Sequence, residues 1–506
     1  MSSLEVVKKD LKEVEVFSEK SDKDDNINTT TIAAQATPTG FGGVGIIRIS
    51  GPKVLEIAIK ILKFTPKPRY AYYTNFIDNN SDEVIDSGIA IYFKGPNSYT
   101  GEDVLELQGH GGPVVLNKML NTLTYLGVDL ANPGDFSKRA FLNGKLDLAQ
   151  VEAVADLIHA QSWSAAKAAV RSLSGEFSKK INLMLDSLIK LRVYIESQLD
   201  FSEEEIDFID NKKAQIDLNK LQKEVSNILL SAKQGVVLKE GINIVISGKP
   251  NAGKSSLLNL LSGEEVAIVT SIAGTTRDIL KKNIIISGIP VNIIDTAGIR
   301  ESDNLVEQEG IRRAKEEIKK AEEVLLVIDL DEFLQDIKFN LSTEEIYKNL
   351  KQRMFSSEIE DSNNLTIIFN KADIIDEQYG IDKLNNIVNV LNETAKSKLI
   401  NIIFCSCRSK SNNVDIDKIK NYILKKAGFD KNNTEGSFIA RTRHVNYLNK
   451  VSNNLILAKL NLEQNLGLEL VAEELRLAQD NLSEITGIFT SDDLLGEIFS
   501  TFCIGK

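Results

Sequence analysis

The spacing of apolar residues changes several times along this chain of 506 residues. Over residues 28–145, short β-rich runs such as "VGIIRIS" and "GIAIYF" alternate with Gly and Pro, which predicts an α+β domain. From 146 to 238, apolar residues recur at every third or fourth position without an internal proline, which predicts helices. Trp163 stands in an Ala-rich part of this helical region, and we expect its side chain to lie in the core.

Residues 239–432 change to a pattern in which apolar strands alternate with helical stretches. The strands are "INIVIS", "VNIIDT", "EVLLVIDL", "LTIIFN" and "LINIIFCS", and this alternation is typical of a parallel, doubly wound α/β sheet. Residues 433–506 return to the helical period. Because neither helical segment alone buries its apolar stripe well, we predict one discontinuous helical-bundle domain that the α/β domain interrupts. Residues 1–27 are charged and lack the apolar core of a signal peptide, so we expect a disordered extension there.

Composition limits the partners and the cellular compartment that we expect for the protein. The net charge is −12, whereas tight binding to nucleic acid usually needs a basic balance, so an RNA partner must be met through a local basic patch or a second protein. Three cysteines provide no disulfide framework, which favours a reducing compartment. No apolar run reaches the roughly 18 residues of a membrane span. We therefore expect a cytoplasmic location and no membrane partner.

The segment "GKPNAGKS" (248–255) lies between a predicted strand and a predicted helix, which is the setting of a P-loop. Its glycines let backbone N–H groups surround phosphates, with help from the helix N-terminus. Lys254 is expected to reach the β- and γ-phosphates, and Ser255 to bind Mg²⁺. The predicted nucleotide contacts in this segment are Asn251, Ala252, Gly253, Lys254, Ser255 and Ser256.

Two further segments follow the P-loop in the order in which GTPases carry their two switch regions. In "IAGTTRD" (272–278), Thr276 is the better candidate to complete the Mg²⁺ shell. Asp295 ends a predicted strand and is placed to meet Mg²⁺ through water, while the Gly298 amide can contact the γ-phosphate. Ile299 occupies the step where Ras-type GTPases have a glutamine, and its side chain cannot hydrogen-bond the attacking water. The predicted contacts here are Thr270, Ser271, Ile272, Ala273, Gly274, Thr275, Thr276, Asp295, Thr296, Ala297 and Gly298.

Guanine selection is predicted from "IIFNKAD", which places Asn370, Lys371 and Asp373 just after a strand. The Asp373 carboxylate can accept both the ring N–H and the exocyclic amine of guanine. Adenine has no amine there and would leave a carboxylate without a partner, so the site favours GTP. The segment "FCSCR" adds Ser406 and the backbone near Cys407 on the guanine oxygen.

Several longer segments resemble one family. They are "TIAAQATPTGFGGVGIIRISG", "PNSYTGEDVLELQGHGGP", "PGDFSKRAFLNGKLDLAQVEA", "AIVTSIAGTTRD" and the tail "FCIGK". With the P-loop and guanine motifs, they make the chain similar to the MnmE (TrmE) family of tRNA-modification GTPases from about residue 29 to Lys506. The resemblance implies an N-terminal folate-binding domain that dimerises, a discontinuous helical domain and an inserted Ras-like GTPase domain.

The resemblance also implies a reaction. In this family, a homodimer joins a flavin-dependent partner, MnmG, in a heterotetramer that modifies C5 of the wobble uridine of certain tRNAs, which are bound mainly through the complex. The added group is of the aminomethyl or carboxymethylaminomethyl type, and its one-carbon unit comes from 5,10-methylenetetrahydrofolate. The cofactors implied are GTP, Mg²⁺, K⁺ and this folate, for which 5-formyltetrahydrofolate is an analogue.

The family resemblance accounts for Ile299. Relatives use potassium in place of an arginine finger and hydrolyse GTP when two G domains meet. On this sequence, the K⁺ ligands implied are Asn251 and the backbone carbonyls of Thr270, Ile272 and Thr275. Water orientation is then assigned to Glu307, which joins Lys254 as a catalytic residue; without the family, Glu307 reads as part of a solvated helix face.

For the folate, the matching positions are Arg48, Glu106, Lys145 and Lys506. A carboxylate can pair with the amino-pyrimidine edge while cations meet the glutamate tail. Each residue has an alternative reading: Arg48 could form a surface ion pair, and Lys145 could begin a helix. Cys503 could be a nucleophile or a packing residue, and His110 is expected to structure a loop or lie near the ligand.

Other function classes stay open from the residues alone. A regulatory or ribosome-assembly GTPase would share the nucleotide motifs but would need neither the N-terminal segments nor the "FCIGK" tail. A folate-binding scaffold whose G domain only reports nucleotide levels is a third reading.

Overall fold

The computed structural model describes residues 30–200, 211–262, 281–295, 316, 319–336, 364–373, 401–407, 413–429, 438–487, 492–500, 502 and 505. The chain divides into two compact units. The first, residues 1–155 with 487–506, is called the terminal unit here, and the second, residues 156–486, the central unit.

The terminal unit contains a six-stranded sheet with the strand order β3-β4-β5-β2-β1-β6. Its strands are β1 (Ile32–Gln35), β2 (Gly42–Ser50), β3 (Ala71–Ile77), β4 (Val84–Phe93), β5 (Val104–Gly111) and β6 (Asp129–Leu130). Neighbouring strands are antiparallel except β1 and β6, which run parallel. Ile47 and Ile49 are buried, while Arg48 between them faces the other side, as the two-residue period of a strand requires.

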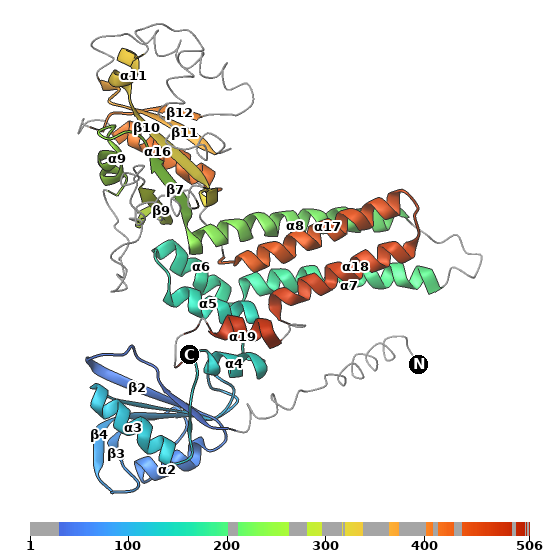
Figure 1. Cartoon of the computed structure of the whole chain (residues 1–506). Helices are drawn as coiled ribbons and strands as arrows, with labels where there is room; N and C mark the ends of the chain where they lie inside the picture. The colour runs from blue at the N-terminus through green and yellow to red at the C-terminus, as the bar shows by residue number, and fades with distance from the viewer. Residues whose placement is uncertain are drawn as a thin grey trace. The chain divides into compact units, whose positions relative to one another are not determined.

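Two helices cover one face of this sheet, α2 (Val54–Leu62) and α3 (Pro113–Tyr125). Their buried residues, such as Ile57 and Leu116, form one core with Ile47 and Leu107 of the sheet (Figure 1). The predicted α+β class of this region is confirmed.

Both ends of the chain contribute to the terminal unit. Helix α4 (Asp135–Leu142), the start of α5 (Leu148–Ile158) and α19 (Asp492–Ser500) lie in it, and the last of these buries Phe499 against Leu148 and Val151. Gly134 has φ +79°, and a Cβ there would lie 2.6 Å from the Phe499 carbonyl oxygen, so only glycine fits this approach.

Long helices form a bundle in the central unit. They are α7 (Glu176–Asp200), α8 (Asn211–Glu240), α17 (Thr442–Glu463) and α18 (Leu468–Thr486). Helix α17 packs against α18 and α8, and α18 packs against α7 (Figure 1). Leu448, Val451 and Leu455 are buried at the helical spacing that the sequence predicts. Helices from before and after the α/β segment therefore share one bundle.

The shorter helix α6 (Trp163–Leu173) corrects one prediction. Its buried positions are Ala165, Ala168, Ala169 and Ser172, whereas Trp163 is 74% exposed. The expected core position of Trp163 is therefore wrong, because the helix packs through its small residues and leaves its largest side chain outside.

The second sheet of the central unit has the order β12-β11-β10-β7-β9-β8. Its strands are β7 (Ile242–Ser247), β8 (Lys281–Ile286), β9 (Ile289–Asp295), β10 (Glu323–Asp329), β11 (Leu365–Asn370) and β12 (Asn401–Phe404). Helices α9 (Lys254–Leu261), α11 (Leu330–Asp336) and α16 (Asn413–Lys426) belong to the same α/β region. The five predicted strands, β7 and β9 to β12, pair in parallel, which confirms the prediction of a parallel sheet. Strand β8, which was not predicted, joins the sheet beside β9 and is antiparallel to it. Ser287 and Gly288, both at positive φ, form a two-residue turn, and a turn this short permits only antiparallel neighbours.

None of the helices that the structure describes is both long and apolar enough to cross a membrane.

Candidate functional site

The P-loop connects β7 to α9 and has a backbone that curls around a central space. Gly248, Asn251 and Gly253 have φ values of +143°, +64° and +99°. A Cβ at Gly248 would collide with the Val327 carbonyl oxygen of the neighbouring strand, so the turn requires glycine. Such a curled backbone before a helix N-terminus suits phosphate groups.

Lys254 is buried at the start of α9, and its Nζ donates to the carbonyl oxygens of Gly248 and Lys249 at 2.6 and 2.8 Å. The ammonium group therefore lies inside the curve of the loop, where it can meet phosphate oxygens. Ser255 and Ser256 follow in the first turn and are exposed, so the Ser255 hydroxyl is accessible to a cation. The chemistry of this donor set fits a nucleotide with Mg²⁺.

Asn370, at the end of β11, links the P-loop to the predicted guanine loop. Its Nδ2 donates to the Ala252 carbonyl oxygen at 2.9 Å, and its Oδ1 accepts from the backbone N–H of Cys407 at 3.2 Å. A Cβ at Gly253 would collide with the Asn370 amide. Three predicted segments that are far apart in sequence thus meet at one buried side chain.

Asp373 is exposed beside this contact, and its Oδ1 accepts a hydrogen bond of 2.6 Å from the buried Ser406 hydroxyl. Lys371 has φ +64°, and its ammonium group contacts the Asp329 carboxylate at the end of β10. A hydrogen bond with Cys405 lowers the pKa of the Cys407 thiol against the opposing effect of burial. Asn370, Asp373 and Ser406 are therefore gathered at the carboxyl ends of the parallel strands, where α/β sheets bind ligands.

The remaining nucleotide predictions concern residues outside the described part of the chain. These are Thr270, Ser271, Ile272, Ala273, Gly274, Thr275, Thr276, Thr296, Ala297, Gly298 and Glu307. The backbone of Asp295 is described and pairs in register with Ile246, next to the start of the P-loop.

In the terminal unit, Arg48 and Glu106 are direct cross-strand neighbours on β2 and β5. The Arg48 Nε and Nη2 atoms lie 3.0 and 2.9 Å from Glu106 Oε1. Arg48 Nη1 donates to the carbonyl oxygen of Gly505 at 3.2 Å, and its guanidinium lies over the Tyr99 ring. Arg48 thus pairs with another predicted folate residue and also holds the chain's last residues.

Lys145 follows α4 with its side-chain stem beside Gly101, and Lys506 lies outside the described residues. His110, which was expected to structure a loop or to lie near the ligand, is on β5. Asp86 accepts from the His110 backbone N–H at 2.7 Å and lies 2.8 Å from its Nδ1. Burial raises the pKa of the Asp86 carboxyl, but these hydrogen bonds outweigh burial and hold the pKa below its usual range.

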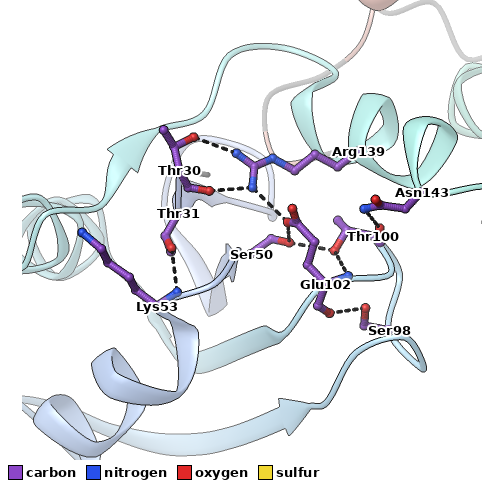
Figure 2. Close-up of polar contacts among 9 residues, drawn as sticks. All are labelled: Thr30, Thr31, Ser50, Lys53, Ser98, Thr100, Glu102, Arg139 and Asn143. Carbon is purple, nitrogen blue, oxygen red and sulfur yellow. Dashed lines mark hydrogen bonds and ion pairs between the residues drawn. The ribbon is translucent and has the colours of Figure 1, made fainter. Parts of the chain in front are cut away.

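The terminal unit also contains a buried polar network that was not predicted (Figure 2). Arg139 on α4 has a side chain only 3% exposed, and its Nη1 lies 2.9 Å from Glu102 and 2.8 Å from the Thr30 carbonyl oxygen. Glu102 also accepts from the Ser50 hydroxyl at 2.8 Å. The network also holds Thr100, through the Ser50 hydroxyl and the Asn143 side chain, and the neighbouring Tyr99 ring lies under the Arg48 guanidinium. A charged residue between buried neighbours in "FSKRAF" is the sequence signal that could have revealed it.

Two family models together match most of the chain. A family model described as the MnmE helical domain matches residues 148–503, and one described as the GTP-binding protein TrmE N-terminus matches residues 31–145. The tRNA modification GTPase MnmE of Coxiella burnetii strain RSA 493 is 49% identical over 478 residues, which cover 94% of this chain and 98% of that protein. The MnmE of Marinomonas sp. strain MWYL1 is 48% identical over 94% of this chain and 98% of its own.

A crystal structure of a GTP-binding protein from Sulfolobus solfataricus in complex with GDP covers 48% of this chain and 66% of its own, at 19% identity. Its TM-score of 0.26 is too low to add to the assignment. The two family models and the close relatives cover the nucleotide region, the helices and the N-terminal sheet together. On this basis, the chain belongs to the MnmE family of tRNA modification GTPases.

Proposed function

We propose that this chain is the GTP-hydrolysing subunit of an enzyme that modifies the wobble uridine of certain tRNAs. As a homodimer with the flavin-dependent partner MnmG, it adds an aminomethyl or carboxymethylaminomethyl group to C5 of uridine 34. The one-carbon unit comes from 5,10-methylenetetrahydrofolate. One observation carries the proposal: a P-loop of the GTPase type occurs in the same chain as the Arg48–Glu106 pair, which contacts the chain's own tail at Gly505. A GTPase that acts only in assembly or regulation would need no such second site.

At the nucleotide, each residue has a separate task. Lys254 neutralises phosphate charge, Asp373 selects guanine with the help of Ser406, and Ser255 with Thr276 would hold Mg²⁺. Mg²⁺ and K⁺, when bound, supply positive charge where the transition state is most negative. The buried position of Lys254 and the access to Ser255 support these roles.

Asn251 would provide the side-chain ligand for K⁺. It lies exposed in the P-loop, and its φ of +64° is a conformation that Asn adopts more readily than most residues. The backbone carbonyls of Thr270, Ile272 and Thr275 would complete the ligand set when two G domains meet. Glu307 then orients the attacking water, a task for which Ile299 has no suitable group.

The potassium role predicts a cation-dependent rate. GTP hydrolysis by the full chain should be about 10³-fold slower in Na⁺ than in K⁺ at matched ionic strength, if the ion replaces an arginine finger. The Asn251→Ala variant should lose this difference, whereas Asn227→Ala, an exposed change on α8, should retain it. Equal rates in the two salts for the unmodified protein would exclude the potassium site.

For the folate, Glu106 would accept hydrogen bonds from the pterin amines while Lys145 and Lys506 meet the glutamate tail. The side chains of Arg48 and Glu106 are 18% and 17% exposed, which leaves their edges accessible to a ligand. Arg48 would act here mainly by orienting the Glu106 carboxylate and the tail.

The test is mass spectrometry of wobble uridines from cells that lack this gene. The modified nucleoside should disappear, should return with the unmodified gene, and should not return with the Glu307→Ala form. Unaltered modification in the deletion strain would reject the proposal in favour of a regulatory or ribosome-assembly GTPase.

A further inference from the structure

Trp163 is the only tryptophan in the sequence, and it is 74% exposed at the first position of α6. The helix start beneath it is fixed. The Ser162 hydroxyl accepts from the Ala165 backbone N–H at 3.1 Å and donates to the Gly288 carbonyl oxygen at 2.6 Å. The Trp163 indole is therefore held on an anchored helix and does not pack in the core.

Two cationic residues follow Trp163 along α6. Lys167, one turn along α6, is exposed, and its Nζ lies 5.8 Å from the centre of the Trp163 ring. Arg171 follows one turn later, and His159 is exposed just before the helix. The sequence has no acidic residue between Asp156 and Glu176, although the chain carries 72 acidic residues and a net charge of −12. We call His159, Trp163, Lys167 and Arg171 the α6 patch.

We propose that the α6 patch binds an unpaired nucleobase of the tRNA substrate, with the base stacked on the Trp163 indole and Lys167 beside the adjoining phosphate. This inference rests on the proposed function and adds a contact site for its substrate. Exposed aromatic rings with neighbouring cations are the usual means of holding single-stranded RNA, since every base offers a flat face. The patch is also the kind of local basic surface that an acidic protein needs to meet RNA.

The composition of the patch favours RNA over a protein partner. Lys167 lies beside the exposed ring, and the sequence has no acidic residue between Asp156 and Glu176, so the charge of the patch complements the phosphates of RNA. A paired RNA helix would hide its base faces, so the proposal applies to a loop such as that of the anticodon.

The single tryptophan permits a direct test in the full-length protein. Its fluorescence, excited where tyrosine does not absorb, is followed during titration with an anticodon stem–loop RNA. The same RNA annealed to its complement serves as the paired control. We expect strong quenching by the stem–loop and little by the duplex. Equal quenching by both, or none by the stem–loop, would overturn the proposal.

Substitutions separate stacking from charge. Trp163→Ala should weaken stem–loop binding by about 5- to 100-fold, and Trp163→Phe by much less, because phenylalanine keeps a stacking face. Lys167→Gln should lower affinity and reduce the salt slope by about one. Tyr125→Ala, which removes an aromatic ring that is 79% exposed on α3, is the matched control and should change nothing.

The two proposals fail in different ways. GTP hydrolysis should be the same in Trp163→Ala and the unmodified protein. If wobble modification depends on this gene but Trp163→Ala binds the stem–loop normally, only the stacking site is wrong. Quenching by the flavin-dependent partner without quenching by RNA would assign the patch to a protein contact and would also overturn the inference.

Discussion

Asp373→Asn should change the preferred nucleotide of this protein from GTP to xanthosine triphosphate. In the proposed guanine site, the Asp373 carboxylate would accept two hydrogen bonds from guanine, whereas an amide can accept only one and would donate toward the exocyclic amine. Hydrogen bonds to charged groups contribute about 1.5–3 kcal/mol each, so GTP affinity should fall roughly 10²- to 10⁴-fold. Xanthine has an oxygen in place of that amine and can accept from the new amide. Competition of the two nucleotides for a fluorescent analogue would measure the change.

The control for this experiment is Asp331→Asn, which makes the same chemical change at α11 near the end of β10. It should leave both affinities unchanged. Ser406→Ala should weaken GTP binding less than Asp373→Asn, because it removes only the 2.6 Å hydrogen bond that orients the carboxylate. If Asp373→Asn keeps its preference for GTP, the guanine site has been assigned to the wrong residues.

Arg139→Met should destabilise the terminal unit by about 3–5 kcal/mol. Methionine fills much of the same volume, but Glu102 and the Thr30 carbonyl oxygen would lose a partner in a place that water barely reaches. The buried carboxylate carries most of the cost. Hydrogen exchange of amides in β2 and β5, measured by mass spectrometry in the full chain, would report the stability of this unit alone.

Two further variants make this result specific. Lys63→Ala removes a surface ion pair with Asp82, whose side chain is 78% exposed, and should change stability by no more than about 0.5 kcal/mol. Arg139→Met combined with Glu102→Gln should recover part of the loss, because no unpaired charge remains. A loss below about 1 kcal/mol in the single variant would mean that water or another group replaces Arg139 without difficulty.

Local patterns in the sequence were sufficient for much of the fold. The P-loop, two strands of the first sheet and the five parallel strands of the second follow from short periods and from glycine positions, which depend only on neighbouring residues. The buried face of α6 is marked by the helical spacing of Ala165, Ala168, Ala169 and Ser172, and not by its largest apolar residue, Trp163. Strand β8 was not predicted, although Ser287 and Gly288, both at positive φ, form a hairpin turn between it and β9.

Other features could not be read from local pattern. The contact of Arg48 with Gly505 joins residues 457 positions apart, and that of Arg139 with Thr30 joins residues 109 positions apart. Such pairs depend on how strands and helices meet in space. The family resemblance did select Arg48 and Glu106, but it did not indicate that the two side chains pair with each other.

The participation of α19 in the terminal unit has a consequence for biosynthesis. Phe499 and Phe502 pack with Leu148 and Val151, so the ribosome must translate the whole central unit before that cluster can form. Leu148 and Val151 on α5 would therefore wait, partly uncovered, while the bundle and the α/β region emerge and fold. Chaperones that shield nascent chains would be needed most during this interval, and slow translation of the middle of the message would prolong the exposure.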